Sequence, residues 1–116
     1  MVNDIQNKII IIGGGFIGEL LHMMLKSKGF EINHFKKDSN VRNRTFALSP
    51  SSVDWLRSVG LPSNFFESLS EIKSMKIFDS SIKNSVTLNA DDAQKPALAY
   101  MANEKDFDEA IKNTFN

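Results

Sequence analysis

The sequence contains no cysteine, which excludes a disulfide framework, a thiolate metal site and a cysteine nucleophile. It also lacks net charge, because 14 Lys and Arg residues balance 14 Asp and Glu residues, so nucleic acid is not expected as a partner. Long apolar runs are missing too, since residues 9–12 are far too short for a signal sequence or a membrane span. We therefore expect a cytoplasmic chain, with peripheral attachment to a membrane or to a biosynthetic complex left open.

What is present is the composition of one ordinary soluble domain. The chain has 116 residues, of which 41% are hydrophobic and 24% are charged, so it can bury a core but cannot hold several domains. Its cations gather at Lys36, Lys37, Arg42 and Arg44, with only Asp38 opposing them locally. Such a segment is either a solvated loop or a place where a small anion binds.

The first part of the chain has the pattern of a strand, a helix and a second strand. Residues 8–12 form a short β-branched run, typical of a strand buried on both faces. From Phe16 onward, apolar residues recur at the spacing of one helical face, and Gly29 is a stop signal. Residues 30–35 predict a second strand, which we expect to pair in parallel with the first after a right-handed crossover.

The pattern changes in the middle of the chain. Ser49 followed by Pro50 indicates a helix start and Gly60 a helix stop, so a second helix is predicted between them. Three short strands follow, separated by turns rich in Ser, Asn and Asp, and suggest a small antiparallel sheet. These strands are predicted at residues 75–78, 86–88 and 98–101. A final amphipathic helix is predicted over residues 106–115.

The predicted fold class is therefore α/β, with a Rossmann-like βαβ start followed by part of a small antiparallel sheet. We divide the chain into residues 1–74, the βαβ portion with the helix after it, residues 75–102, the antiparallel strands, and residues 103–116, a terminal helix that leads back to the first portion. Only two parallel strands are predicted, whereas a doubly wound sheet has several, so we expect an incomplete fold. Its unpaired hydrophobic edge would allow the chain to dimerise.

Gly13, Gly15 and Gly18 satisfy the dinucleotide-binding pattern G-x-G-x-x-G, directly after the first strand and at the start of the first helix. The first glycine permits the tight turn, the second lets a pyrophosphate approach the backbone, and the third lets the helix pack closely on the strand. Free N–H groups at the helix N-terminus would then face the anion. The alternative is a glycine-rich turn that only connects strand and helix.

A dinucleotide site of this type has an acidic residue about 20 residues further on, where it bonds the ribose hydroxyls. Lys36 stands near that position, and the nearest carboxylate is Asp38. Lysine has only donors and cannot accept a hydrogen bond from a hydroxyl, but it could meet a 2′-phosphate. Three alternatives stay open: Asp38 replaces the acid after a small register shift, the ligand carries extra negative charge, or binding has been lost.

A second segment strengthens the nucleotide hypothesis. Residues 44–52, with the sequence Arg-Thr-Phe-Ala-Leu-Ser-Pro-Ser-Ser, join the glycine motif and residues 98–101 in a pattern that resembles the N-terminal part of the flavin-dependent aromatic hydroxylases of ubiquinone biosynthesis. That family is similar to para-hydroxybenzoate hydroxylase. The resemblance implies FAD as cofactor, with its ADP half on the glycine motif and Arg44 beside its phosphate or flavin edge. It also implies NAD(P)H as reductant and dioxygen as the source of the oxygen transferred to an aromatic substrate.

The resemblance further implies that residues 1–74 belong to an FAD-binding domain and residues 75–102 to a substrate domain. Members of the family are much longer, so this chain alone is not expected to be catalytically competent, and an aromatic substrate is expected only if a C-terminal half completes it. We assign no catalytic residue and no metal ligand, and we interpret His22 and His34 as structural or surface residues. Two other hypotheses stay open: an NADPH-binding Rossmann protein of another class, favoured by Lys36, and a truncated remnant or assembly partner.

Overall fold

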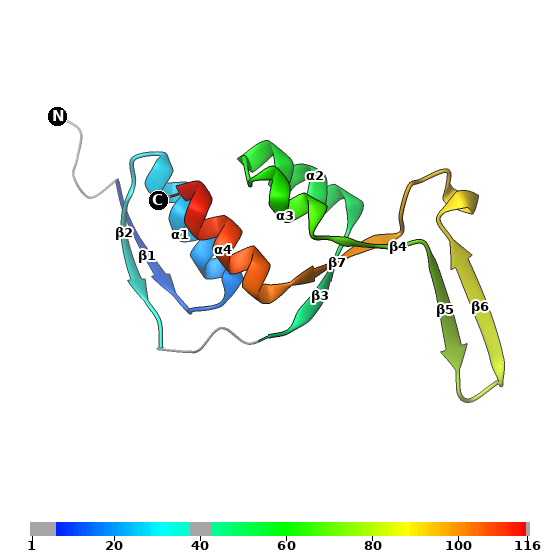
Figure 1. Ribbon diagram of the computed structural model, residues 1–116. Helices are drawn as coiled ribbons and strands as arrows, with labels where there is room; N and C mark the ends of the chain where they lie inside the picture. Colours follow the sequence, from blue (N-terminus) through cyan, green and yellow to red (C-terminus); the bar gives the residue numbers. More distant parts are fainter. Residues whose placement is uncertain (1–6, 38–42, 116) are drawn as a thin grey trace.

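The computed structural model describes residues 7–37 and 43–115 (Figure 1). In chain order its elements are β1 (Lys8–Ile12), α1 (Phe16–Ser27), β2 (Glu31–Phe35), β3 (Thr45–Leu48), α2 (Pro50–Val59), α3 (Ser63–Glu67), β4 (Ser70–Ile72), β5 (Ser74–Asp79), β6 (Asn84–Asn89), the 3-10 helix η2 (Asp91–Ala93), β7 (Ala99–Asn103) and α4 (Glu104–Phe115). The strands form three sheets, ordered β1-β2, β3-β7-β4 and β5-β6. Among the described residues, no helix is both long and apolar enough to cross a bilayer.

The first sheet is the predicted βαβ unit. β1 and β2 pair in parallel, with Ile11 opposite His34, and α1 connects them. Gly29 follows α1 with φ of +90°, a conformation that glycine adopts readily, so the predicted stop is confirmed. Buried Ile11 alternates with exposed Ile10 and Ile12. The expectation that β1 is buried on both faces is therefore wrong for the described residues, because α1 covers one face and no described element covers the other.

The second sheet has β7 at its centre, with β3 and β4 antiparallel on either side. The sequence patterns did not predict β3 or β4. These strands have four and three residues, which is too short for an alternating pattern to be recognised. β3 lies within residues 44–52, so the sheet brings this segment next to the start of α4.

The expected antiparallel sheet of three strands is not formed as predicted, because one of the three strands belongs to a different sheet. The strands predicted at residues 75–78 and 86–88 do pair, as the hairpin β5–β6. The strand predicted at residues 98–101 is β7, which pairs instead with segments from earlier in the chain. Figure 1 shows the hairpin extending away from the helices. The division into residues 1–74, 75–102 and 103–116 stays a prediction.

Side-chain caps define where two helices begin. The Ser49 hydroxyl accepts a hydrogen bond from the Ser52 backbone N–H at 3.2 Å, and Gly60 ends α2 with φ of +96°, as predicted. The Asn103 side-chain oxygen accepts a hydrogen bond from the Lys105 backbone N–H at 2.9 Å. Because Asn103 acts as this cap, α4 begins two residues before the predicted position.

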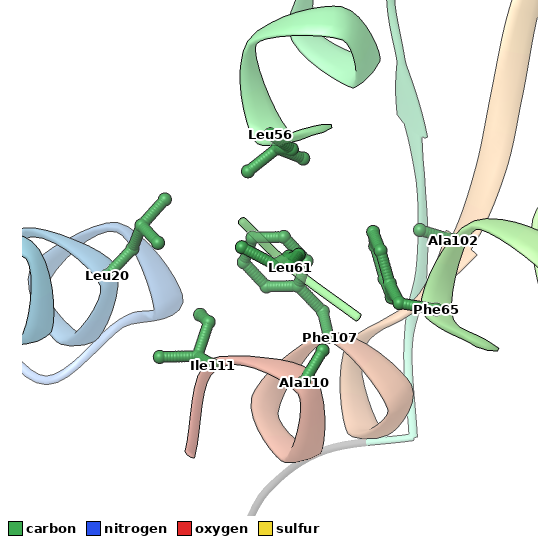
Figure 2. Close-up of a cluster of buried hydrophobic side chains, with 8 residues drawn as sticks. All are labelled: Leu20, Leu56, Leu61, Phe65, Ala102, Phe107, Ala110 and Ile111. Carbon is green, nitrogen blue, oxygen red and sulfur yellow. The ribbon is translucent and has the colours of Figure 1, made fainter. Parts of the chain in front are cut away.

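The hydrophobic core lies where the helices meet beside β7 (Figure 2). Its buried side chains are Leu20, Leu56, Leu61, Phe65, Ala102, Phe107, Ala110 and Ile111. Three of them, Phe107, Ala110 and Ile111, form the predicted apolar face of α4. α4 packs against α1, so the core fixes the helix that follows the glycine motif relative to the second sheet.

The chain is elongated and exposes much surface. Its radius of gyration is 18.4 Å and its principal extents are 63, 30 and 27 Å, whereas a compact chain of this length has a radius of gyration of about 13 Å. Its accessible surface is 8614 Å², against about 6,300 Å² for a typical folded monomer of this mass. Apolar side chains contribute to the excess, such as Ile12 in β1 and Phe78 in the hairpin, which are 85% and 71% exposed.

Candidate functional site

The glycine motif forms the turn between β1 and α1, and its three glycines differ in their surroundings. Gly13 has φ of +125°, where other residues are strained, and its N–H donates to the Phe35 carbonyl oxygen at 2.9 Å. A Cβ at Gly18 would come within 2.7 Å of the Gly13 carbonyl oxygen, which is too close. Gly15, the N-cap of α1, has φ of −73° and ψ of 171°, and a Cβ there would meet no heavy atom within 4 Å. The fold itself therefore requires Gly13 and Gly18 but not Gly15.

Gly15 marks the side of the turn where a ligand has room to approach. The first N–H groups of a helix have no acceptor within the helix, and a glycine N-cap has no side chain that could accept from them. Together with the helix dipole, these donors favour an anion. The geometry permits the predicted contact between a pyrophosphate and the backbone at Gly15, and that contact stays a prediction.

Arg44 precedes β3 and is held by Glu104, the first residue of α4. Its Nε and Nη2 atoms donate to the two carboxylate oxygens of Glu104 at 2.8 and 3.0 Å. The Glu104 backbone N–H donates to the Arg44 carbonyl oxygen at 2.8 Å. The side-chain hydrogen bond to Glu104, followed by the charge of that carboxylate, raises the pKa of Arg44 above its ordinary value. The guanidinium is therefore a fixed cation with a defined plane.

A cavity of about 180 Å³ connects this cation to the start of α1. It is lined by Phe16, Arg44, Thr45, Phe46 and Glu104. The Phe16 and Phe46 rings stack with centroids 4.8 Å apart, and the Phe107 ring packs edge-on against both. Phe16 is the first residue of α1, so this aromatic cluster holds the end of the glycine motif beside Arg44.

Lys36, near the position of the expected ribose ligand, forms an ion pair with Glu19 of α1. The Glu19 side chain is only 15% exposed, and a Cβ at Gly14 would come within 2.9 Å of the Lys36 Cβ. Lys36 therefore lies against the glycine turn with its charge compensated inside the chain. Asp38, the alternative ribose ligand, lies outside the described residues, as does Arg42.

Two carboxylates that the sequence patterns did not predict pair with two of the predicted site residues. Glu104 is 60 residues from Arg44, and only the pairing of β3 with β7, which sets Thr45 opposite Asn103, brings the two together. A helical amphipathic pattern carries no signal for such a contact. Glu19 stands one residue after Gly18, but its pairing with Lys36 depends on the parallel register of β1 and β2.

No protein-family model and no curated protein sequence matches the chain. Its structure, however, is similar to several solved structures. 2,6-Dihydroxypyridine-3-hydroxylase from Arthrobacter nicotinovorans is 14% identical with a TM-score of 0.62, and the match covers 95% of this chain and 27% of that one. p-Nitrophenol 4-monooxygenase PnpA from Pseudomonas putida DLL-E4 is 19% identical with a TM-score of 0.65, covering 93% and 29%. Klebsiella pneumoniae HpxO, complexed with FAD and uric acid, is 13% identical with a TM-score of 0.63, covering 94% and 28%.

These similarities establish the fold of the chain and the share of each larger structure that it covers. The predicted α/β fold class, with a βαβ start and short antiparallel sheets, is confirmed. The chain spans less than a third of the length of each of these enzymes. Over nearly its whole length, therefore, the chain has the fold of the N-terminal portion of flavin monooxygenases.

Proposed function

We propose that this chain forms the pyrophosphate-binding part of an FAD site, within a flavin-dependent monooxygenase that hydroxylates an aromatic ring. One observation carries the proposal: a single cavity is lined both by Phe16, the first residue of α1, and by Arg44. Backbone N–H groups at a helix start and a planar guanidinium are the two kinds of donor that best suit phosphate oxygens. The structure of HpxO, which has the same fold over this region, is described as a complex with FAD.

Arg44 in the cavity lining and Gly15, which directly precedes the lining residue Phe16, fit a pyrophosphate. The open space at Gly15 lets a phosphate reach the backbone, and the bidentate pairing with Glu104 uses only two of the five N–H donors of Arg44. Lys36 and Asp38 would lie toward the ribose end of the cofactor. FAD, when bound, would supply the redox and oxygen chemistry, and the protein would supply position and exclusion of water.

The complete reaction requires more polypeptide than this chain, which spans about a quarter of the solved enzymes. In our proposal NAD(P)H is the reductant and a phenol similar to a ubiquinone precursor is the aromatic substrate, and both bind only when the rest of the fold is supplied. The hairpin β5–β6 would belong to a substrate domain. Peripheral association with a membrane or a biosynthetic complex would place the enzyme near an apolar substrate.

Two alternative functions make different demands on the site. An NADPH site would use Lys36 to hold the 2′-phosphate, and the phosphate would there lie beside the partly buried Glu19 carboxylate, as it would lie beside Glu104 at Arg44. An inactive assembly partner is favoured by the large exposed surface. Among the described residues β1 pairs only with β2, and for the isolated chain its other edge would then allow dimerisation or aggregation.

The test is the flavin content of the purified chain after excess FAD has been added and then removed by desalting, with size exclusion and an NADPH titration alongside. We expect stoichiometric FAD and no tight NADPH binding. Arg44→Gln should lose most of the flavin, whereas Lys76→Gln, which removes an equal charge from the exposed hairpin strand β5, should retain it. Tight NADPH binding without FAD would contradict the proposal, and a folded chain that binds neither would favour the assembly partner.

A further inference from the structure

Two histidines that the sequence patterns predict to be structural or surface residues lie together beside the glycine turn. His22 comes from α1 and His34 from β2, and their Nδ1 atoms are 3.0 Å apart. The Nε2 atom of His34 lies 2.5 Å from the Gly13 carbonyl oxygen. The ring centroids are 5.2 Å apart with the planes inclined by 66°. A chain of polar contacts therefore runs from α1 through β2 to the turn.

The chemistry of the partners fixes where the protons lie. The Gly13 carbonyl oxygen can only accept, so Nε2 of His34 carries a hydrogen and donates it. When His34 is neutral its Nδ1 is an acceptor, and Nδ1 of His22 must be the donor. One added proton preserves the contact, because either ring can then donate to the other. A second added proton leaves two N–H groups and two positive charges facing each other, and the contact must break.

The Gly13 carbonyl is held by the His34 ring, which in turn is fixed by His22. β2 holds Gly13 at both ends, since its N–H donates to the Phe35 carbonyl oxygen and its own oxygen accepts from His34. The same oxygen sits over Gly18, where an added Cβ would lie 2.7 Å from it and 3.4 Å from the Nε2 atom of His34. His34 thus keeps the glycine turn close to both β2 and the first turn of α1. This close packing sets the direction of the N–H groups in the turn.

We propose that His34 is a positioning residue of the glycine turn, and that protonation of both rings breaks the His22–His34 contact that fixes the His34 ring. Repulsion between the two cations then displaces that ring from the Gly13 carbonyl, so that affinity for a dinucleotide falls in acid. The inference deepens the proposed function and rests on it. Neither histidine touches the ligand in this account. Their effect reaches the ligand through the Gly13 carbonyl.

The charged groups around the two histidines set the pH range in which the contact between them is lost. Burial lowers the pKa of His22 below its ordinary value, and the positive charges of His34, Lys26 and Lys36 lower it further, while Glu19 acts in the opposite direction. The second proton therefore enters below the ordinary histidine pKa of about 6.5. The contact is therefore expected to be lost only as the pH falls below that ordinary value.

The first experiment is NMR of the full chain carrying ¹⁵N-labelled histidine, because ring nitrogen shifts report which nitrogen holds the hydrogen. At about pH 8 we expect His34 as the Nε2–H tautomer and His22 as the less common Nδ1–H tautomer. Neutral His22 in the Nε2–H form, or averaging between forms, would overturn the inference. This readout needs no bound flavin.

The second experiment compares FAD affinity at about pH 8 and about pH 5.5 for matched variants. For the unmodified chain we expect a loss of roughly tenfold in acid, the effect expected when one hydrogen bond no longer holds the turn. His22→Gln can donate or accept without titrating, so it should keep the affinity at the higher pH and lose the pH dependence. His34→Gln can still donate to Gly13 and should behave similarly, whereas His34→Phe should bind weakly at both values.

The two levels of the proposal fail in different ways. If the unmodified chain retains no FAD at about pH 8 while the histidine tautomers are as expected, the FAD function fails and the contact network stands. If FAD binds equally well at both pH values, or if His34→Phe binds as tightly as His34→Gln, the histidine inference fails and the FAD function stands. If His34→Phe does not fold, His22→Gln and the tautomers still decide the outcome.

Discussion

Gly18 and Gly15 are both part of the dinucleotide motif, yet the structure predicts opposite results when each is replaced by alanine. Gly18 lies in the first turn of α1, where alanine is intrinsically better than glycine by about 1 kcal/mol. Against this gain stands the added methyl, which would come within 2.7 Å of the Gly13 carbonyl oxygen. That oxygen belongs to the backbone, and contacts with Phe35 and His34 hold Gly13 in place, so it cannot rotate away.

The cost of the clash at Gly18 is larger than the gain. Overpacking a closely packed site costs about 1–3 kcal/mol, and the upper half of that range applies here because the obstructing atom is backbone. After the gain in helix propensity is subtracted, we expect Gly18→Ala to lower the free energy of unfolding by about 1–2 kcal/mol. FAD binding should weaken with it, because the turn must move to admit the methyl.

Gly15→Ala should leave the fold intact and weaken the binding of FAD. The backbone at Gly15 is in an extended conformation that alanine adopts readily, and no heavy atom lies within 4 Å of the added methyl. Because alanine is a poorer N-cap than glycine, the free energy of unfolding should fall, but by no more than about 1 kcal/mol. The methyl does, however, occupy the space through which a phosphate would reach the backbone. The affinity for FAD should fall by at least roughly tenfold.

Urea denaturation followed by circular dichroism, together with FAD titration of both variants, measures the two effects separately. Each variant is the control for the other, since both add one methyl to the same motif. An unfolding free energy for Gly18→Ala equal to that of the unmodified chain would refute the close approach of α1 to the turn. Unchanged FAD affinity in Gly15→Ala would refute the contact of the phosphate with the backbone there.

Three further predictions concern the rest of the fold. Ile111→Ala removes the largest fully buried side chain among the described residues and should destabilise the chain by about 2–5 kcal/mol in the same denaturation assay. Asn103→Ala removes the cap of α4 and should cost about 1 kcal/mol, whereas Asn113→Ala, in the last turn of α4, should cost less. The pKa of His22 is lower in the folded chain than its ordinary value of about 6.5, so below that pH the unfolded chain binds more protons than the folded chain. The free energy of unfolding should therefore decrease as the pH drops below about 6.5, and it should decrease less in His22→Gln.

The local parts of the fold could be predicted from sequence because their signals are local. The cap at Ser49 and the stop at Gly60 define α2, and the first strand, first helix and second strand follow from runs of apolar residues punctuated by glycine. Even the distinct roles of Gly13 and Gly18 follow from the spacing of the motif, since a tight turn before a helix forces the helix close to the strand.

The parts that could not be predicted depend on which distant segments pair. β3 and β4 are too short to have a recognisable pattern, and they are strands because β7 lies between them. The partner of Arg44 follows from that pairing, and so does the cavity beside Phe16. His34 was set aside because its neighbours in sequence are not ligands, whereas its actual partners, His22 and Gly13, lie 12 and 21 residues away.

The hairpin β5–β6 exposes apolar surface in a part of the molecule away from the candidate site (Figure 1). The glycine turn and Arg44 are fixed by the aromatic cluster and the core that α1 shares with α4, all within the described residues. In the hairpin, Ile77 stands opposite Val86 with both exposed, whereas Ile12 is exposed next to the turn. A partner or further polypeptide that covers the hairpin would therefore add stability without rebuilding the turn. Pyrophosphate binding should consequently be measurable in this chain by itself, whereas hydroxylation should depend on what covers the rest.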